Sequence, residues 1–452
     1  MVLPTAGWSS AADEGVQLSA RTFMVAPGVA TPSLDELKAG GGVARLTAAM
    51  ETAARTTPME VVGPAATYGV RSTVPATVAS DEPTEAGAAA APPKVVYPEP
   101  ARTMTLKECK QKMAGTARVY VKSWMAVCTG LKVTTTWARG SGQVGMSSYV
   151  VYVRGVVPKD NDRTVYFTYD VTDFTIVGTT GASGLKIGLK GTIPQDWPAR
   201  ATPVLGKALP VTKTWLQMQS KPSYIHTVRY APGQGTGAGA ADLIAAVYQP
   251  EVISTLPAGW VGESPQTGRL FMFAPRWDAA PYLRNSTGGS IPANRGGAVF
   301  SMIGTLQYRT KAGAPEQAVA RHIKQAFTNP RATKPLNALK NVPGDNVNEL
   351  LNRLFLDERR HERNHTLAVQ ECKRSWGPRY TDGGKQCDEF PFASTYQGAA
   401  LAESDPHAEK KNFSVLPVPG TQNRDAGILL RGFYNSNRII DGVEDGFIVK
   451  ID

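Results

Sequence analysis

The most informative stretch of this 452-residue chain is residues 387–398, which read CDEFPFASTYQG. Two adjacent acidic residues, Asp388 and Glu389, follow the cysteine that opens the stretch. A carboxylate can accept a proton from water or bind a divalent cation, so an adjacent pair can divide these two tasks. Because successive residues of a β-strand point to opposite faces, we expect only one carboxylate to face a site unless the strand bends or ends there. The alternative is that one of them caps a helix that begins near Ser394.

A second polar segment follows at residues 422–427, which read QNRDAG. Asn423 offers a neutral oxygen to a hard cation such as Mg²⁺ or Mn²⁺, and Arg424 can hold a phosphate through two parallel hydrogen bonds. An apolar stripe predicts a helix that begins at Asn423, and a helix N-terminus favours phosphate. The members of the stripe are Ala426, Leu430 and Phe433. Two other interpretations stay open: Asn423 is only an N-cap, and Arg424 pairs with Asp425 or Asp441.

Together these two segments resemble the NucA/NucB family of secreted bacterial deoxyribonucleases. The family carries a C-D-E-aromatic-P-F-A-S-T block and then an asparagine–arginine pair that opens a helix, and Cys372 and Trp376 fit the lead-in of actinobacterial members. The resemblance covers residues 314–452 and implies a small α+β nuclease domain similar to the ββα-metal nucleases. It also implies a metal-dependent DNA endonuclease that hydrolyses phosphodiester bonds of extracellular DNA with Mg²⁺ or Mn²⁺.

The resemblance implies a role for each polar residue of the two segments. Asp388 is the expected catalytic base, because the block has no histidine where many ββα-metal nucleases carry one. Glu389 would orient the water or the metal, and Arg424 would bind phosphate. Asn423 and Gln397 would bind the metal. The family more often has glutamate where Gln397 stands, so this metal site would carry one negative charge fewer.

The four cysteines fall into two pairs. A bridge between Cys372 and Cys387 would close a loop of 15 residues, anchor the strand that carries Asp388 and contribute about 3 kcal/mol to stability. Cys109 and Cys128 flank the first predicted strand of the preceding region and are expected to form a second bridge, unless they are two buried free thiols. Disulfides are typical of oxidising compartments, so we expect a secreted protein. No ordinary signal peptide is visible at the given N-terminus, which lacks a basic segment followed by an apolar one.

Composition divides the preceding chain into two regions. Residues 1–101 are rich in Ala, Thr, Pro, Gly and Val, which predicts a disordered N-terminal region apart from one short helix near residues 33–55. Residues 102–313 contain short β-branched and aromatic runs separated by turn residues, which predict an all-β, sandwich-like domain. These runs are 131–137, 148–156, 164–169, 185–189, 224–230, 270–273 and 299–308.

Residues 314–452, the predicted nuclease domain, open with helical patterns. Apolar residues recur every four positions in 319–327, which predicts one helix. Apolar residues also recur at helical spacing in 347–355, which predicts a second helix. A final strand is expected at residues 446–451.

Charge is distributed unevenly along the chain. The formal net charge is +11, but residues 102–320 carry +13 whereas residues 381–452 carry −4. A basic body attracts a polyanion such as DNA, and an acidic C-terminal segment is what a cation-binding site requires. The charge assigns no specific partner to the β-rich domain. No apolar run approaches the length of a membrane-spanning helix, so we expect no membrane span.

Residues 361–365 read HERNH, a literal H-E-x-x-H motif. On a helix, His361 and His365 would share a face that can bind zinc, with Glu362 as the base of a metalloprotease. The charged run DERR at residues 357–360 instead predicts an exposed helix. Two alternatives to a nuclease therefore stay open: a zinc metalloprotease that uses these three residues, and a catalytically inactive secreted binding protein.

Overall fold

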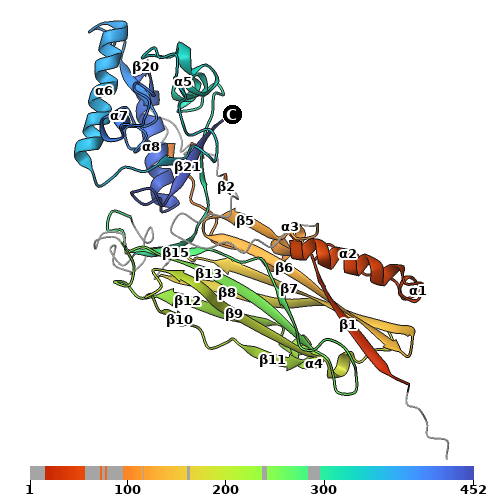
Figure 1. Cartoon of the computed structure of the whole chain (residues 1–452). Coiled ribbons are helices and arrows are strands. Elements are labelled where there is room, and N and C mark those ends of the chain that lie inside the picture. The colour runs from red at the N-terminus through yellow and green to blue at the C-terminus, as the bar shows by residue number, and fades with distance from the viewer. Residues whose placement is uncertain are drawn as a thin grey trace, which may run out of the picture.

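The computed structural model describes residues 16–55, 72–73, 77–78, 95–115, 117–159, 163–236, 242–283 and 296–452. These residues form two units, a flat β-sandwich and a smaller mixed α/β unit that carries the C-terminus (Figure 1). The figure shows the C-terminal unit above one end of the sandwich. Within the described ranges, no helix is long and apolar enough to cross a membrane.

The first sheet of the sandwich is antiparallel and runs in the order β1-β6-β7-β8-β12-β10, with β5 also paired to β6. Its longest strands are rich in β-branched and aromatic residues, and β6 and β7 are buried along most of their length because β7 also contacts α1 and α3. Its strands are β1 (Leu18–Val25), β5 (Val119–Ser123), β6 (Ala126–Arg139), β7 (Gly142–Val156), β8 (Thr164–Gly178), β10 (Pro203–Leu205) and β12 (Ser223–Tyr230).

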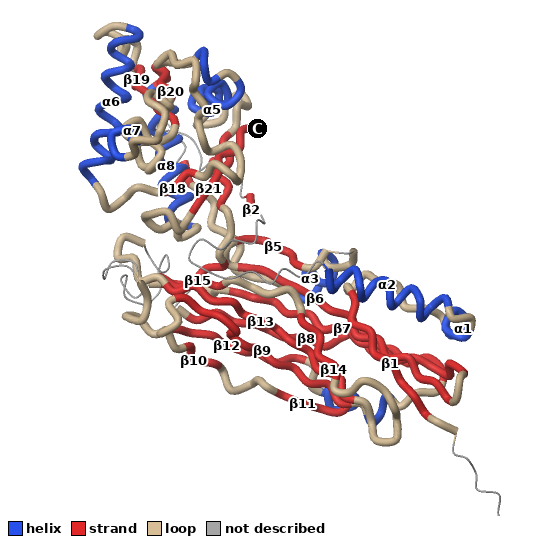
Figure 2. Tube along the Cα trace, in the orientation of Figure 1, coloured by secondary structure: helices blue, strands red, loops and turns tan. Residues whose placement is uncertain are grey.

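The second sheet runs in the order β11-β9-β13-β15-β16, with β14 paired to β13, and Figure 2 shows the two sets of strands as layers. The layers share one core, in which Phe167 of β8 stacks on Tyr248 of β13 with ring centroids 3.6 Å apart. The predicted sandwich is therefore confirmed. The strands of this sheet are β9 (Lys186–Trp197), β11 (Val211–Thr214), β13 (Ile244–Thr255), β14 (Gln266–Arg269), β15 (Pro275–Asp278) and β16 (Gly297–Phe300).

Part of the N-terminal region is ordered, which refines the expectation for residues 1–101. Strand β1 pairs with β6 along its whole length and buries Phe23. The predicted short helix is present as α1 (Leu34–Lys38) and α2 (Gly41–Arg55), and Ser33 caps α1 with Glu36 in a capping box. The low-complexity run at 86–93 lies outside the described residues.

Several short elements complete the sandwich side of the chain. Helix α3 (Leu106–Lys112) is tied to β6 by the disulfide between Cys109 and Cys128, which confirms that predicted bridge. The remaining elements are α4 (Trp215–Ser220), the 3₁₀ turn Ala182–Gly184, and the paired strands β3 (Thr77–Val78) and β4 (Val95–Val96).

The C-terminal unit contains a small sheet, a hairpin and four helices among its described residues. The sheet runs in the order β18-β21-β17-β2, and β19 pairs with β20 in an antiparallel hairpin. The strands are β2 (Ser72–Thr73), β17 (Gly304–Tyr308), β18 (Leu351–Asn352), β19 (Lys385–Phe390), β20 (Ser414–Pro419) and β21 (Gly446–Ile451). The helices are α5 (Gln317–Thr328), α6 (Glu358–Trp376), α7 (Leu401–Ser404) and α8 (Gly420–Ser436), with a 3₁₀ turn at Pro330–Ala332.

Two boundaries differ from the sequence-based expectation. The predicted strand at 299–308 is two strands, because β16 ends in the sandwich at Phe300 and β17 pairs in parallel with β21. The C-terminal unit therefore begins before residue 314. The helix predicted at 347–355 is wrong: this segment contains β18, where Leu351 pairs with Phe447 of β21 and is buried in extended backbone. The helix predicted over 319–327 is confirmed as α5.

Buried ion pairs join the two units. Asp278 at the end of β15 accepts two hydrogen bonds from Arg438, at 3.0 Å from Nε and 2.5 Å from Nη2. Arg276 pairs with Asp445, and its other terminal nitrogen donates to the carbonyl of Arg438 at 2.9 Å. All four side chains are almost completely buried. The sandwich and the C-terminal unit are thus held together by charges that have little contact with water.

Candidate active site

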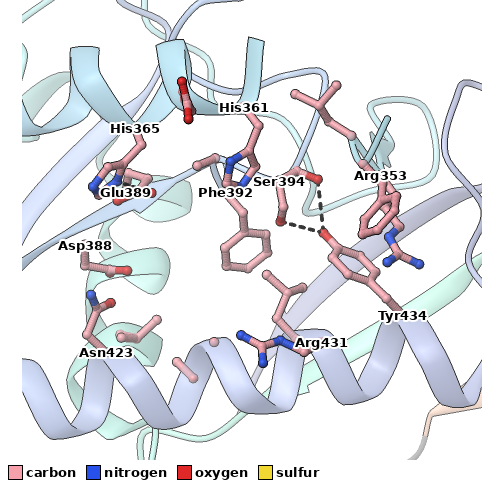
Figure 3. A pocket seen from close by; sticks show the side chains of 18 of the residues that line it. Arg353, His361, His365, Asp388, Glu389, Phe392, Ser394, Asn423, Arg431 and Tyr434 are labelled. Carbon is pink, nitrogen blue, oxygen red and sulfur yellow. Dashed lines mark hydrogen bonds and ion pairs between the residues drawn. The ribbon is translucent and has the colours of Figure 1, made fainter. Parts of the chain in front are cut away.

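The C-terminal unit contains a pocket of about 750 Å³. Its walls come from β19, from α6, from α8 and from residues 353–355, and Tyr282 of the sandwich completes one end. Figure 3 shows two groups of polar side chains in it, with Asp388, Glu389, His365 and Asn423 on one side and Arg353 and Tyr434 on the other.

Asp388 and Glu389 both border this pocket. They leave β19 toward different helices: the carboxylate of Asp388 contacts His322 of α5, and that of Glu389 contacts His365 of α6. The strand ends at the next residue, Phe390, which is the condition under which both could reach one site. Neither acidic residue caps a helix near Ser394, because the described chain has turns there.

A buried hydrogen-bonded chain holds Asp388 in place. His322 Nδ1 lies 2.6 Å from Asp388 Oδ2, and His322 Nε2 lies 2.7 Å from the hydroxyl of Ser414 on β20. Asp388, His322 and Ser414 are 5%, 1% and 0% exposed. Burial raises the pKa of Asp388, and the interaction with His322 opposes that rise. Sequence reasoning missed His322: its position three residues after Val319 places it on the apolar side of the predicted helix, but nothing in that position identifies Asp388 as its partner.

Helix α6 presents the H-E-x-x-H motif to the same pocket. The side chains of His361, Glu362 and His365 are exposed, as the charged sequence predicted, and all three border the pocket. His365 Nδ1 lies 3.5 Å from Glu389 Oε1, and this hydrogen bond raises the pKa of His365. The disulfide between Cys372 and Cys387 is present, so it fastens α6 to β19 beside Asp388.

Helix α8 contributes Asn423 and Arg431. The helix begins at Gly420, so Asn423 lies inside it and is not its N-cap. The Asn423 amide nitrogen donates to Gln386 Oε1 at 3.2 Å, which leaves the amide oxygen for another partner. Figure 3 shows the guanidinium of Arg431 turned into the pocket, where it has no hydrogen-bonding partner among the described residues.

The comparison with protein families bears directly on this pocket. Residues 350–449 match the family model of the deoxyribonucleases NucA/NucB. The C-terminal region carries a NucA/NucB domain. The match spans β19, α6 and α8, and it excludes His322 and Tyr282. No curated protein and no solved structure matches the chain.

Two predicted residues of the NucA/NucB domain lie away from its pocket. Gln397 accepts a hydrogen bond from the backbone of Asn352 at 2.9 Å and donates to that residue's side chain at 2.8 Å, so it fastens β18 instead of facing the site. Arg424 is exposed and both of its contacts go to Asp425, at 3.1 and 2.9 Å, as one alternative anticipated. Gln397 and Arg424 therefore do not border the pocket, and their metal and phosphate roles stay predictions.

The donors at the acidic end fit a hard cation better than zinc. Zinc sites use three or four protein ligands, and the described residues contain no group of three His, Cys, Asp or Glu side chains close enough to hold a metal. Mg²⁺ instead takes one or two carboxylates together with water and substrate phosphates. The oxygens of Asp388, Glu389 and Asn423 provide that kind of donor set.

Proposed function

We propose that the chain is a metal-dependent DNA endonuclease that hydrolyses phosphodiester bonds of extracellular DNA, with Mg²⁺ or Mn²⁺ as cofactor. The observation that carries the proposal is one pocket that holds Asp388 and Glu389 of β19 together with Asn423 and Arg431 of α8 in a NucA/NucB domain. The two disulfides support an extracellular setting.

Asp388 accepts the proton of the attacking water in this proposal. Burial raises the pKa of its carboxyl, and a carboxylate of higher pKa is a stronger base. The bond to His322 fixes one carboxylate oxygen, which directs the group toward the pocket. As the water oxygen bonds to phosphorus, the bond to the leaving oxygen breaks. The leaving oxygen takes a proton from bulk water, Asp388 later releases its proton to bulk water, and the products are a phosphate monoester and a hydroxyl end.

Glu389 and Asn423 are the proposed cation ligands, with Asp388 close by. A divalent cation bound there would offset the negative charge that develops on the phosphate. Arg431, on the same helix as Asn423, holds a phosphate oxygen, because its guanidinium points into the pocket. His365 adds positive charge at the acidic end, since its hydrogen bond to Glu389 raises its pKa.

Cleavage of supercoiled plasmid with Mg²⁺ or Mn²⁺, with and without EDTA, tests this proposal against its alternatives. We expect cation-dependent cleavage that Asp388→Ala abolishes and that His361→Ala leaves largely in place. A parallel assay with casein and Zn²⁺ tests the metalloprotease: casein cleavage lost in His361→Ala would contradict the nuclease. Absence of plasmid cleavage with every cation would favour the inactive binding protein.

A further inference from the structure

The end of the pocket away from Asp388 is aromatic. Tyr282, Phe355 and Tyr434 border it, and Arg353 lies among their rings. These residues come from separate parts of the chain, because Tyr282 follows β15 of the sandwich, Phe355 follows β18, and Tyr434 belongs to α8. The nuclease proposal gives this end no task.

Arg353 holds the three rings in fixed positions. Its guanidinium carbon lies 4.8 Å from the ring centroids of Phe355 and Tyr434 and 5.3 Å from that of Tyr282. The side chain is 4% exposed, and Nη1 donates to the carbonyl of Ile439 at 2.8 Å. A cation over aromatic faces in a buried site is a strong contact. The rings are therefore a preformed surface.

Asp441 fixes the backbone and the ring on either side of this surface. Its backbone N–H donates to the hydroxyl of Tyr282 at 2.8 Å. Its carboxylate accepts hydrogen bonds from the backbone N–H groups of Phe355, at 2.6 Å, and Leu356, at 3.1 Å. A single residue thus couples the sandwich tyrosine to the segment that carries Phe355.

One face of the Phe355 ring stacks on Tyr282, with ring centroids 4.4 Å apart and an angle of 29°. Arg353 does not cover the Phe355 face that is turned away from Tyr282. An atom over that face would be about twice as far from the Tyr282 ring as from the Phe355 ring. The guanidinium carbon of Arg353 is instead nearly equidistant from both rings. Phe355 is 43% exposed, which is high for a phenylalanine that borders a pocket.

We propose that Phe355, backed by Tyr282, stacks against the base of an unpaired nucleotide whose phosphate lies between Arg431 and Asp388. Every nucleobase has a flat face that stacks on an aromatic ring, and an adjacent arginine strengthens such contacts. A base inside a duplex must first leave its stack, which costs free energy, so single-stranded DNA is expected to bind this site more tightly than duplex DNA. The sandwich completes the site through Tyr282. This inference rests on the proposed nuclease function.

Equilibrium binding separates the stacking contact from cleavage. The probe is a fluorescein-labelled single-stranded DNA in Mg²⁺, measured by anisotropy in an Asp388→Asn background so that it stays intact. Adding Phe355→Leu is expected to weaken binding by about 5- to 150-fold, the range for loss of one stacked base. Phe355→Tyr keeps the ring and is expected to keep the affinity. Leu356→Ala is the matched control, because Leu356 is exposed but does not border the pocket.

Two further probes decide between stacking and a structural role. A strand of the same length without bases should bind the Phe355→Leu variant and its parent with equal affinity. The substitution should also lower the affinity for duplex DNA less than it lowers the affinity for single-stranded DNA. Equal losses on the strands with and without bases would overturn the proposal, as would unchanged single-strand affinity. If the wild type cleaves no DNA but single-strand binding still depends on Phe355, the nuclease proposal fails and the stacking site stands.

Discussion

Two buried polar clusters in this chain each hold aspartate against a basic side chain, and they have different tasks. One joins Asp388 to His322 and Ser414 inside the C-terminal unit, and the other joins Asp278 and Asp445 to Arg438 and Arg276 between the units. In the second cluster both oxygens of each carboxylate have partners: those of Asp278 bind Arg438 and the backbone, and those of Asp445 bind Arg276 and the backbone.

Asp388 differs because its carboxyl, which interacts with His322 and the backbone N–H of Glu389, also borders a pocket. A buried carboxylate that is fully partnered stabilises the fold and has no capacity left for a substrate. One that lies at a pocket wall can reach a substrate. Burial alone therefore does not mark a catalytic acid, and access to a pocket does.

Removal of divalent cations should have the largest effect on DNA cleavage. It should act at the pocket that Asp388 borders and not at the interface cluster. EDTA is expected to reduce DNA cleavage to background, because the acidic end would then repel the phosphate. Mg²⁺ or Mn²⁺ should restore cleavage. Thermal unfolding in EDTA should shift far less, since the interface carboxylates are already paired with Arg276 and Arg438. Cleavage that persists in EDTA would remove the cation from the proposed mechanism.

Breaking the interface cluster should cost stability. Asp278→Asn leaves Arg438 buried without its carboxylate, and such a change typically costs about 3–5 kcal/mol. Urea denaturation measures this loss. Asp382→Asn is the matched control, because the pair of Arg379 and Asp382 is 87% and 58% exposed and should contribute less than about 1 kcal/mol. A similar, small loss in both variants would mean that the interface is not held by this cluster.

His322→Gln should affect catalysis by disturbing the position of Asp388. Glutamine keeps a hydrogen-bonding group but not the imidazole's reach to both Asp388 and Ser414. We expect kcat to fall by about 10- to 100-fold, the usual cost of losing a residue that orients a catalytic group, with KM little changed. A rise in KM with kcat intact would show that His322 acts on substrate binding instead.

The smallest expected effect is the difference in KM between substitutions of two arginines of α8, Arg431 and Arg424. Arg431→Gln is expected to raise KM for DNA about tenfold, because a charge-assisted hydrogen bond to phosphate is lost. Arg424→Gln should change KM less than about twofold, since its exposed ion pair with Asp425 contributes little. Equal changes in KM for the two substitutions would mean that phosphate binding is spread over the exposed surface of α8 and is not specific to Arg431.

The sequence predicted the parts of the site that lie close together in the chain. The pair Asp388 and Glu389 and the bridge of Cys372 with Cys387 could be read from one contiguous block. Arg431 lies seven residues after Arg424, nearly two helical turns, so both project from about the same side of α8 and the helical period alone does not choose between them.

The missed parts depend on contacts between distant segments. His322 reaches Asp388 from α5, outside the matched family region, and Tyr282 reaches the pocket from the sandwich. No local pattern encodes such pairings. The helix predicted at 347–355 failed for a related reason: its apolar residues pack in extended backbone, where Leu351 pairs with β21, so tertiary pairing overrode the local periodicity.

Asp388→Asn tests the central claim most directly when activity and stability are measured on the same preparation. Asparagine keeps the shape but cannot take a proton, so DNA cleavage should fall by about 100- to 10,000-fold. Stability at neutral pH should be equal or higher. Since folding raises the pKa of Asp388, the wild type should lose stability relative to the variant as pH rises from the ordinary aspartate pKa through the raised one. Full activity in the variant, or lost activity together with a destabilised fold, would contradict a catalytic role for this buried carboxylate.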